Sequence, residues 1–240
     1  MLTLADPKVK NVALRECGER FVDLTDYDSR IAVDLSRRYL SNRSPHFLKV
    51  RESIARRLVA ASDALPGAVR LCVLEGYRPL AAQRDYFNRH LTKLRGAHPR
   101  LSDDALFVLA SHYIAPPDVA AHPTGAAIDL RLIAAGSGEP LDLGCVPNAT
   151  DMESSGGCYT HCAFIEPQAA HHRRLLVAAM RSAGFVNYPS EWWHWSYGDR
   201  YWAACERQPF AVYGPVDEAA LEHDEPRPVR VPALHDGAGR

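Results

Sequence analysis

The chain has 240 residues, of which 47% are hydrophobic and 24% are charged, so it is long enough for one domain with a proper core and short for two. Its 28 basic and 29 acidic residues give a formal net charge of −1, without the positive field that non-specific binding to nucleic acid requires. No stretch approaches the roughly 20 uninterrupted apolar residues that a membrane-spanning helix needs. We therefore expect neither a nucleic-acid partner nor a membrane span.

The two ends of the chain give expectations about location and domain boundaries. Asp6, Lys8 and Lys10 stand where a secretory signal would have its apolar block, so we expect a cytoplasmic protein, or a periplasmic one if the sequence is truncated. Residues 224–240 are rich in Pro, Gly and charges, a composition typical of a disordered tail. We therefore predict one domain over residues 1–223, and its oligomeric state cannot be read from the sequence.

Hydrophobic periodicity predicts the first elements. Apolar residues recur at helical spacing over residues 52–65, where Pro66-Gly67 ends the pattern. A strand over residues 69–74 then leads to the segment Gly76-Tyr77-Arg78, and Pro79 can open a helix that carries apolar residues as far as Leu94. Arg78 is thereby expected at a strand-to-helix junction.

The second half predicts further helices and one informative strand. Ser102 is a suitable N-cap for a helix through about Ile114. After it, residues 127–132 alternate with a period of two, which puts the aliphatic side chains on one face and Asp129 on the other.

The remaining segments complete the predicted fold. Residues 144–165 are a long irregular stretch of the kind that lines a site. Residues 167–181 form a helix that Gly184 ends, and Gly198-Asp199 indicates a hairpin turn in the last aromatic segment. Helices and strands segregate rather than alternate strictly, so we predict an α+β fold with a central antiparallel sheet flanked by helices.

Two segments can carry chemistry. The first runs from His122 through Gly125 to Asp129 and the second from Glu191 to His194, so together they offer two imidazoles and two carboxylates. A catalytic zinc takes three ligands from His, Asp and Glu and leaves the fourth position to water. We predict His122, Asp129 and His194 as ligands, with Glu191 as the base.

The spacing alone does not prove this site. A single His is more often a surface or hydrogen-bonded residue than a ligand, so only the combination carries weight. On a regular strand Glu191 and His194 would point to opposite faces. The chain must therefore bend there, and Pro189-Ser190 just before makes an irregular start of the strand plausible.

The three motifs in this order resemble one family. The pattern HxxxxxxD from His122 to Asp129, followed by Glu-Trp-Trp-His ending at His194, with Gly-Tyr-Arg-Pro upstream, is similar to the zinc D-alanyl-D-alanine dipeptidases of the VanX type. That family is grouped with the D-Ala-D-Ala carboxypeptidases and the hedgehog signalling domain. The resemblance implies one zinc ion per chain on the three predicted ligands, Glu191 as general base and then acid, and Arg78 steadying the oxyanion.

The resemblance also implies an activity and leaves alternatives. The first is hydrolysis of the small peptide D-Ala-D-Ala to two D-alanine molecules. The second is a D,D-carboxypeptidase acting on peptidoglycan stem peptides. The third is a zinc-containing binding module without turnover, which Glu191 argues against because such a module has no chemical need for a base. Nutrient recycling and antibiotic resistance would use the same site, and a His, His, Asp site also accepts other divalent ions.

Substrate recognition is less clear from the sequence. In the family, small hydroxyl residues commonly precede the first zinc-binding His, whereas Ala120 and Ala121 stand there in this chain. An Asp is expected to meet the substrate ammonium, and the segment offers Asn148 at the ungapped position and Asp151 three residues later. The role stays open between these two residues.

The cysteines allow three readings. Cys145, Cys158 and Cys162 could form a second, structural zinc site or a local disulfide, or could stay free thiols. No Cys-x2-Cys pair is present, and a chain of this size needs no disulfide framework. The sequence therefore favours free thiols.

Overall fold

A five-stranded mixed sheet forms the centre of the molecule. The computed structural model describes residues 2–36 and 44–222. The strands of the sheet, in spatial order, are β3 (Ile31–Val33), β5 (Val69–Glu75), β6 (Ala127–Ala134), β8 (His194–Ser196) and β7 (Val186–Asn187). β5, β6, β8 and β7 pair antiparallel, whereas β3 runs parallel to β5.

The predicted α+β fold with a central sheet flanked by helices is confirmed, and four of the five strands pair antiparallel as expected, whereas the edge strand β3 makes the sheet mixed. A parallel pair needs a crossover connection. Here the chain between β3 and β5 supplies one, because it passes through β4 (Lys49–Arg51) and α2 (Glu52–Asp63) before it returns to the sheet.

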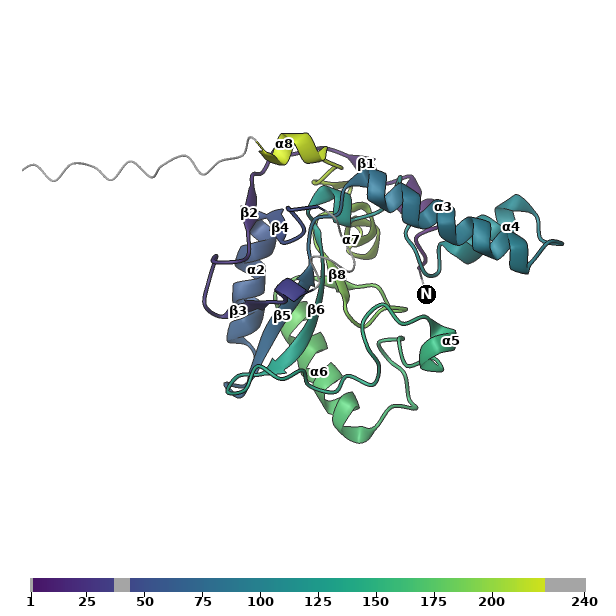
Figure 1. Ribbon diagram of the computed structural model, residues 1–240. Helices are drawn as coiled ribbons and strands as arrows, with labels where there is room; N and C mark the ends of the chain where they lie inside the picture. Colours follow the sequence, from purple (N-terminus) through teal and green to yellow (C-terminus); the bar gives the residue numbers. More distant parts are fainter. Residues whose placement is uncertain (1, 37–43, 223–240) are drawn as a thin grey trace, which may run out of the picture.

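The helices and two small strand pairs surround this sheet. β1 (Ala13–Leu14) pairs with β9 (Phe210–Ala211), and β2 (Phe21–Asp23) pairs with β4. The other helices are α1 (Pro7–Lys10), α3 (Leu80–Ala97), α4 (Asp103–Ala110), α5 (Asp151–Ser154), α6 (Pro167–Ser182), α7 (Arg200–Cys205) and α8 (Glu218–Glu222). Figure 1 shows α3 and α4 projecting from the body of the molecule, above the segment that carries α5.

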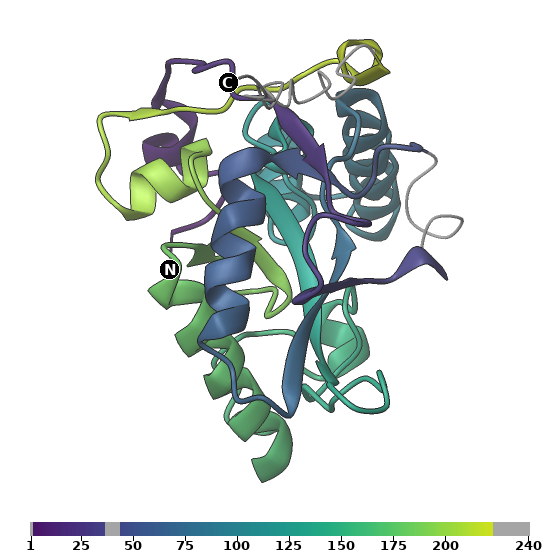
Figure 2. The same ribbon diagram turned by 90° about the vertical axis from the view of Figure 1, so that its left-hand side faces the viewer.

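The main core lies between the sheet and two helices. Figure 2 shows α2 and α6 crossing one face of the sheet. The aliphatic side chains of β6, led by Ile128 and Leu130, are fully buried there with Leu58 of α2 and Leu176 of α6. This confirms the period-two prediction for β6. Since Asp129 alternates with these residues, it lies on the other face of the sheet.

Most helix positions agree with the sequence prediction, and one turn does not. α4 ends at Ala110, earlier than predicted. The Gly198-Asp199 pair does not form a hairpin turn. Asp199 accepts hydrogen bonds from the backbone N–H groups of Tyr201 and Trp202 and is the N-cap of α7. Asp is common both in turns and at helix N-caps, so the Gly-Asp dipeptide alone could not show which of the two structures forms here. The hairpin of this segment instead joins β7 to β8 through residues 188–193.

Three further expectations can be compared with the structure. No helix in residues 2–36 and 44–222 is long and apolar enough to cross a membrane. All six cysteines are free thiols, including Cys145, Cys158 and Cys162. The predicted tail over residues 224–240 lies outside the described residues.

Candidate active site

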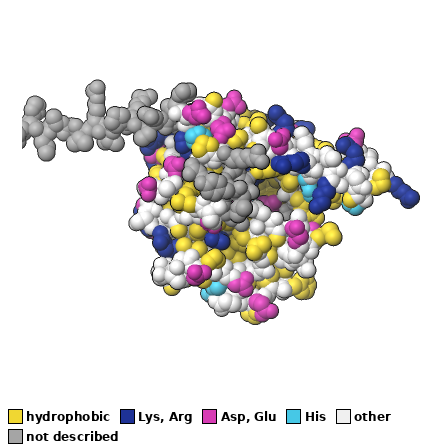
Figure 3. Space-filling model, viewed as in Figure 1, with side chains coloured by type: hydrophobic (Ala, Val, Ile, Leu, Met, Phe, Trp, Pro, Cys, Tyr) yellow, Lys and Arg dark blue, Asp and Glu magenta, His cyan; other side chains and the backbone are white. Residues whose placement is uncertain are grey.

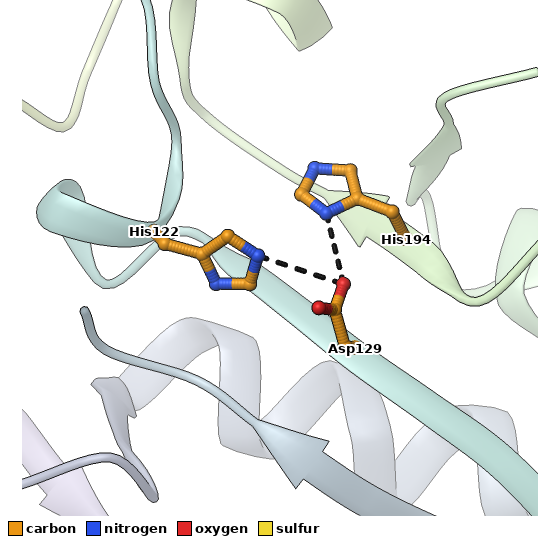
Figure 4. A group of neighbouring side chains, drawn as sticks. All are labelled: His122, Asp129 and His194. Atoms are coloured by element: carbon orange, nitrogen blue, oxygen red, sulfur yellow. Dashed lines mark hydrogen bonds and ion pairs between the residues drawn. The ribbon is translucent and has the colours of Figure 1, made fainter. Parts of the chain in front are cut away.

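The three predicted metal ligands come from separate segments that the fold brings together. His122 begins a short 3-10 helix, η2 (His122–Thr124), Asp129 lies on β6 and His194 opens β8. Asp129 and His194 are register partners on their antiparallel strands. His194 Nδ1 lies 3.0 Å and His122 Nε2 3.5 Å from Asp129 Oδ1, so both imidazoles point at one carboxylate (Figure 4). One donor atom from each residue lies within 4.8 Å of the others.

This donor set fits a divalent metal ion such as zinc. Two imidazole nitrogens and one carboxylate oxygen are the ligands of a catalytic zinc with an open fourth position. His122 Nδ1 donates to the Gly76 carbonyl at 2.6 Å, which leaves the lone pair of Nε2 for a metal. Burial alone would raise the pKa of Asp129, but the rings of His122 and His194 lower it. The cluster therefore presents an anionic oxygen and at least one oriented nitrogen.

The backbone around His122 is fixed by close packing. Gly125, which ends η2, has φ of 70°, a left-handed conformation that favours glycine. A Cβ at this position would lie 2.2 Å from a ring atom of Phe21. The buried Arg51 donates from Nε to the Thr124 carbonyl at 2.9 Å, and its guanidinium lies 4.6 Å from the centre of the Phe21 ring. These contacts hold the loop that carries His122, the first predicted ligand.

Glu191 lies in a turn just before β8. The Glu191 N–H donates to the Tyr188 carbonyl at 2.9 Å, and the His194 N–H donates to the Glu191 carbonyl at 3.1 Å. The chain therefore bends just before β8, as a site that contains both Glu191 and His194 requires. Glu191 Oε2 lies 4.0 Å from His194 Nδ1. Burial, with the charge of Asp129, raises the pKa of Glu191 to about 7, although His194 and Arg78 oppose this shift.

Arg78 follows β5, and its guanidinium is held from two sides. Nε and Nη2 donate to the two oxygens of Glu75 at 2.8 and 2.6 Å. Nη1 donates to Gln83 Oε1 at 2.8 Å, and the Gln83 amide in turn donates to the Ala115 carbonyl. A guanidinium has five N–H donors, so donors remain for a ligand. Burial lowers the pKa of Arg78, but the Glu75 carboxylate raises it by more, so the net pKa is raised. The guanidinium therefore stays cationic.

One cavity joins these groups. Its volume is about 570 Å³, and its lining includes His122, Asp129, His194, Glu191 and Arg78. α3 and the segment 148–151 also line it. The structure therefore places the three predicted ligands, the predicted base and the predicted oxyanion residue around a single space.

The two candidates for substrate recognition also reach this cavity. Asn148 lines it with φ of 68°. Asp151 lines it too, and its Oδ1 accepts hydrogen bonds from the Tyr113 hydroxyl at 2.8 Å and the Met152 N–H at 2.7 Å. Within the described residues, neither side chain is hydrogen-bonded to the three predicted ligands or to Glu191. The geometry therefore puts both in the cavity wall without choosing between them.

One buried cation, Arg173, binds the irregular segment 144–165 and the residue just before it. Arg173 of α6 is 3% exposed. Its guanidinium donates to the carbonyls of Leu143 at 2.6 Å, Tyr159 at 2.5 Å and Gly157. These bonds tie the wall of the cavity to a helix of the core. The sequence prediction that this stretch lines a site is confirmed.

Sequence reasoning missed the two residues that hold Arg78. Glu75 is the last residue of β5 and Gln83 lies in the first turn of α3. An acidic residue three positions before Arg78, at the end of a buried strand, was the available signal for Glu75. No such signal identifies Gln83, because its contact depends on how α3 leaves the junction.

The sequence of this chain is similar to those of known peptidases. A family model described as D-ala-D-ala dipeptidase, Peptidase_M15, matches residues 46–213. A D-alanyl-D-alanine dipeptidase from Synechocystis is 29% identical over 210 residues, which are 73% of this chain and 81% of that protein. A D-alanyl-D-alanine dipeptidase from Enterococcus faecium is 30% identical over 150 residues, 59% of this chain and 69% of that protein.

Among solved structures, a zinc complex of a vancomycin-resistance D,D-pentapeptidase VanY variant aligns with a TM-score of 0.42 and 14% identity, covering 90% of this chain and 99% of that chain. At these values the likeness bears on neither activity nor substrate. The family match spans well over half of the chain and includes all three motifs. The protein therefore belongs to the Peptidase_M15 family, the D-Ala-D-Ala dipeptidase family of metallopeptidases.

Proposed function

We propose that this protein is a zinc-dependent dipeptidase that hydrolyses D-alanyl-D-alanine to two molecules of D-alanine. The observation that carries the proposal is the cluster of His122, Asp129 and His194 beside Glu191 in one cavity. Zinc on these three ligands would polarise the scissile carbonyl and lower the pKa of a bound water. The two curated relatives named as D-alanyl-D-alanine dipeptidases support the choice of substrate.

Glu191 would act as general base and then general acid. Its Oε2 lies 4.0 Å from His194 Nδ1, and burial raises its pKa to about 7. A carboxylate within reach of the attacking water can take one proton and return it to the leaving amine. A binding module without turnover would need no such group, so Glu191 supports an enzyme.

Arg78 would stabilise the developing negative charge of the carbonyl oxygen. Its guanidinium is permanently cationic and is held by Glu75 and Gln83 before substrate binds. A preorganised donor of this kind costs no reorganisation at the moment of reaction. The remaining N–H groups of Arg78 would donate to the oxyanion.

The competing substrate within the same chemistry is a peptidoglycan stem peptide. A cavity of about 570 Å³ lies in the range that encloses drug-sized ligands, so the structure also has room for an acylated substrate. A dipeptidase must hold the free ammonium of its substrate, for which Asp151 and Asn148 are the candidates in the cavity wall. The identity of the preferred substrate is therefore the point to test.

The test is release of D-alanine by the zinc-loaded protein from free D-Ala-D-Ala and, side by side, from N-acetyl-D-Ala-D-Ala. We expect a clear preference in kcat/KM for the free dipeptide. A preference for the acylated form would make the protein a D,D-carboxypeptidase and reject the proposed substrate. Release from neither compound, with zinc bound, would reject the peptidase proposal itself.

A further inference from the structure

Helix α3 presents a basic face to the catalytic cavity. Tyr86, Arg89, His90 and Lys93 all line the cavity. Their spacing of three and four residues places them on one face of the helix. Figure 3 shows Lys and Arg side chains gathered over α3 on this side of the molecule. None of these four residues is assigned a role in the proposed hydrolysis.

Among the described residues, the two cations of this face have no ionic partner. Arg89 donates from Nε to the Asp85 carbonyl at 3.2 Å, and in the described part of the chain neither Arg89 nor Lys93 forms an ion pair. Lys93 lowers the pKa of Glu153, although the hydrogen bonds of Glu153 to Thr150 lower it more. The Glu153 carboxylate is already engaged as part of the cap of α5. Positive charge is thus left for a ligand.

One aromatic ring links this basic face to the reaction centre. The Arg89 guanidinium lies 5.1 Å from the centre of the Tyr86 ring, and the Arg78 guanidinium lies 5.5 Å from the same centre. Both cations therefore contact a single side chain. A substrate oxygen at Arg78 and a second anionic group at Arg89 would be separated by no more than the span of a short peptide.

The cavity is larger than a dipeptide of two alanines needs, which also leaves room for a ligand group at the α3 face. Pockets of roughly 300–1,000 Å³ enclose drug-sized ligands, and the volume here is about 570 Å³. A dipeptide of two alanines is much smaller than such ligands. Arg78 and Glu191 lie at the centre where the bond would break, so the α3 face is available to another part of the substrate.

We propose that Arg89 and Lys93 form a carboxylate-binding subsite of this peptidase, which selects substrates that place an anionic group against this face of α3. The proposal rests on the proposed function and deepens it. The carboxylate can come from the C-terminus of the dipeptide or from an acidic group on its N-terminal side. Guanidinium and ammonium groups bind either one through charge-assisted hydrogen bonds.

The experiment compares the double variant Arg89→Gln/Lys93→Gln with the wild-type protein, both loaded with zinc. The substrates are D-Ala-D-Ala, its C-terminal amide, N-acetyl-D-Ala-D-Ala and N-succinyl-D-Ala-D-Ala, which adds a carboxylate to the acyl group. Arg84→Gln is the matched control, because Arg84 is an exposed cation of α3 that does not line the cavity. Equal melting temperatures of the three proteins show that folding is intact.

The expected result is a loss of about tenfold in kcat/KM, mainly through KM, for the substrates whose carboxylate uses the subsite. A loss for D-Ala-D-Ala but not for its amide identifies the C-terminal carboxylate. A loss for the succinyl compound beyond that for the acetyl compound identifies an acidic N-terminal group. Equal effects on every substrate, or equal effects of Arg84→Gln, would overturn the proposal.

Binding separates failure of this proposal from failure of the proposed function. Calorimetry with the zinc-loaded Glu191→Gln background measures the affinity of the same compounds without turnover. We expect Arg89→Gln/Lys93→Gln to weaken binding of the carboxylate-bearing compounds about tenfold. The affinity of the variant should also depend less on salt concentration than that of the protein with both cations. Unchanged affinity would overturn the subsite even if the wild-type protein is an active dipeptidase. Weakened affinity together with an inactive wild-type protein would retain the subsite and reject the dipeptidase.

Discussion

Glu75 and Asp129 are direct register partners on β5 and β6. Two carboxylates side by side on one face of a sheet repel each other. Each carboxylate has its own partners, since Glu75 binds Arg78 while Asp129 faces the imidazoles of His122 and His194. The sheet thereby fixes an arginine next to the proposed metal ligands before a substrate arrives.

Metal content tests the ligand set. His122→Ala and His194→Ala each remove one of three donors, and we expect both variants to lose stoichiometric zinc after dialysis at neutral pH. Metal analysis of the purified proteins provides the measurement. His171→Ala, which changes a histidine on α6 outside the cluster, is the control and should keep one zinc per chain. Stoichiometric zinc in either ligand variant would show that the wrong residue was chosen.

Replacing Arg78 by lysine tests the oxyanion role. Lysine keeps the charge but loses the planar fork that binds Glu75 and Gln83 together. We expect kcat to fall by about 10²–10³, the typical effect of one lost oxyanion donor, with zinc content unchanged. Steady-state kinetics on D-Ala-D-Ala gives the answer. A change confined to KM would mean that Arg78 binds the ground state and does not stabilise the transition state.

Two glycine substitutions separate backbone strain from a steric clash. Gly125 and Gly138 have φ of 70° and 74°, so alanine is strained by about 1–2 kcal/mol at either position. Only at Gly125 would the new Cβ meet a ring, that of Phe21, whereas nothing lies within 4 Å at Gly138. Overpacking adds about 1–3 kcal/mol, so Gly125→Ala should lose more unfolding free energy in urea than Gly138→Ala. Equal losses would mean that Phe21 moves aside without cost.

A pH dependence of stability follows from Glu52 in the first turn of α2. Hydrogen bonds from Arg20 and Arg56 lower the pKa of Glu52 from 4.5 to about 2. The folded state therefore binds a proton less readily than the unfolded state, so these bonds stabilise the fold above pH 4.5. That contribution disappears as the pH falls from 4.5 towards 2.

Urea unfolding of Glu52→Gln measures this effect. The variant should be less stable than the wild type at pH 6, and the difference should shrink as the pH falls below 4.5. Glu139→Gln, at an exposed residue that forms no ion pair in the described part of the chain, is the control. A difference between wild type and Glu52→Gln that stays constant with pH would contradict the role of the two arginines.

The sequence predicted those parts of the site that local patterns encode. The alternation around Asp129 defined β6 and its faces, whereas the Pro189-Ser190 pair before Glu191 was compatible with the irregular start of β8 but did not predict it. The register that places Asp129 opposite His194 could not be predicted. β6 and β8 are far apart in the sequence, and neither strand's own residues indicate which strand it pairs with.

Other features escaped prediction because their signals are short or ambiguous. The strand Ile31–Val33 has three residues, too few for a clear period, so its parallel pairing with β5 was missed. Gly198-Asp199 has the composition of a turn and of a helix cap, and only the packing of α7 decides between them. The contact of Gln83 with Arg78 likewise depends on tertiary geometry.

Glu191 provides the most direct test of the central claim, which is metal-assisted hydrolysis with this residue as the base. The measurement is D-alanine release from D-Ala-D-Ala by zinc-loaded wild-type protein and by zinc-loaded Glu191→Ala, with the zinc content of both determined. We predict full zinc in both proteins and a loss of about 10²–10⁴ in kcat for the variant, the usual contribution of general acid–base catalysis. Near-normal turnover of Glu191→Ala with full zinc would contradict the account.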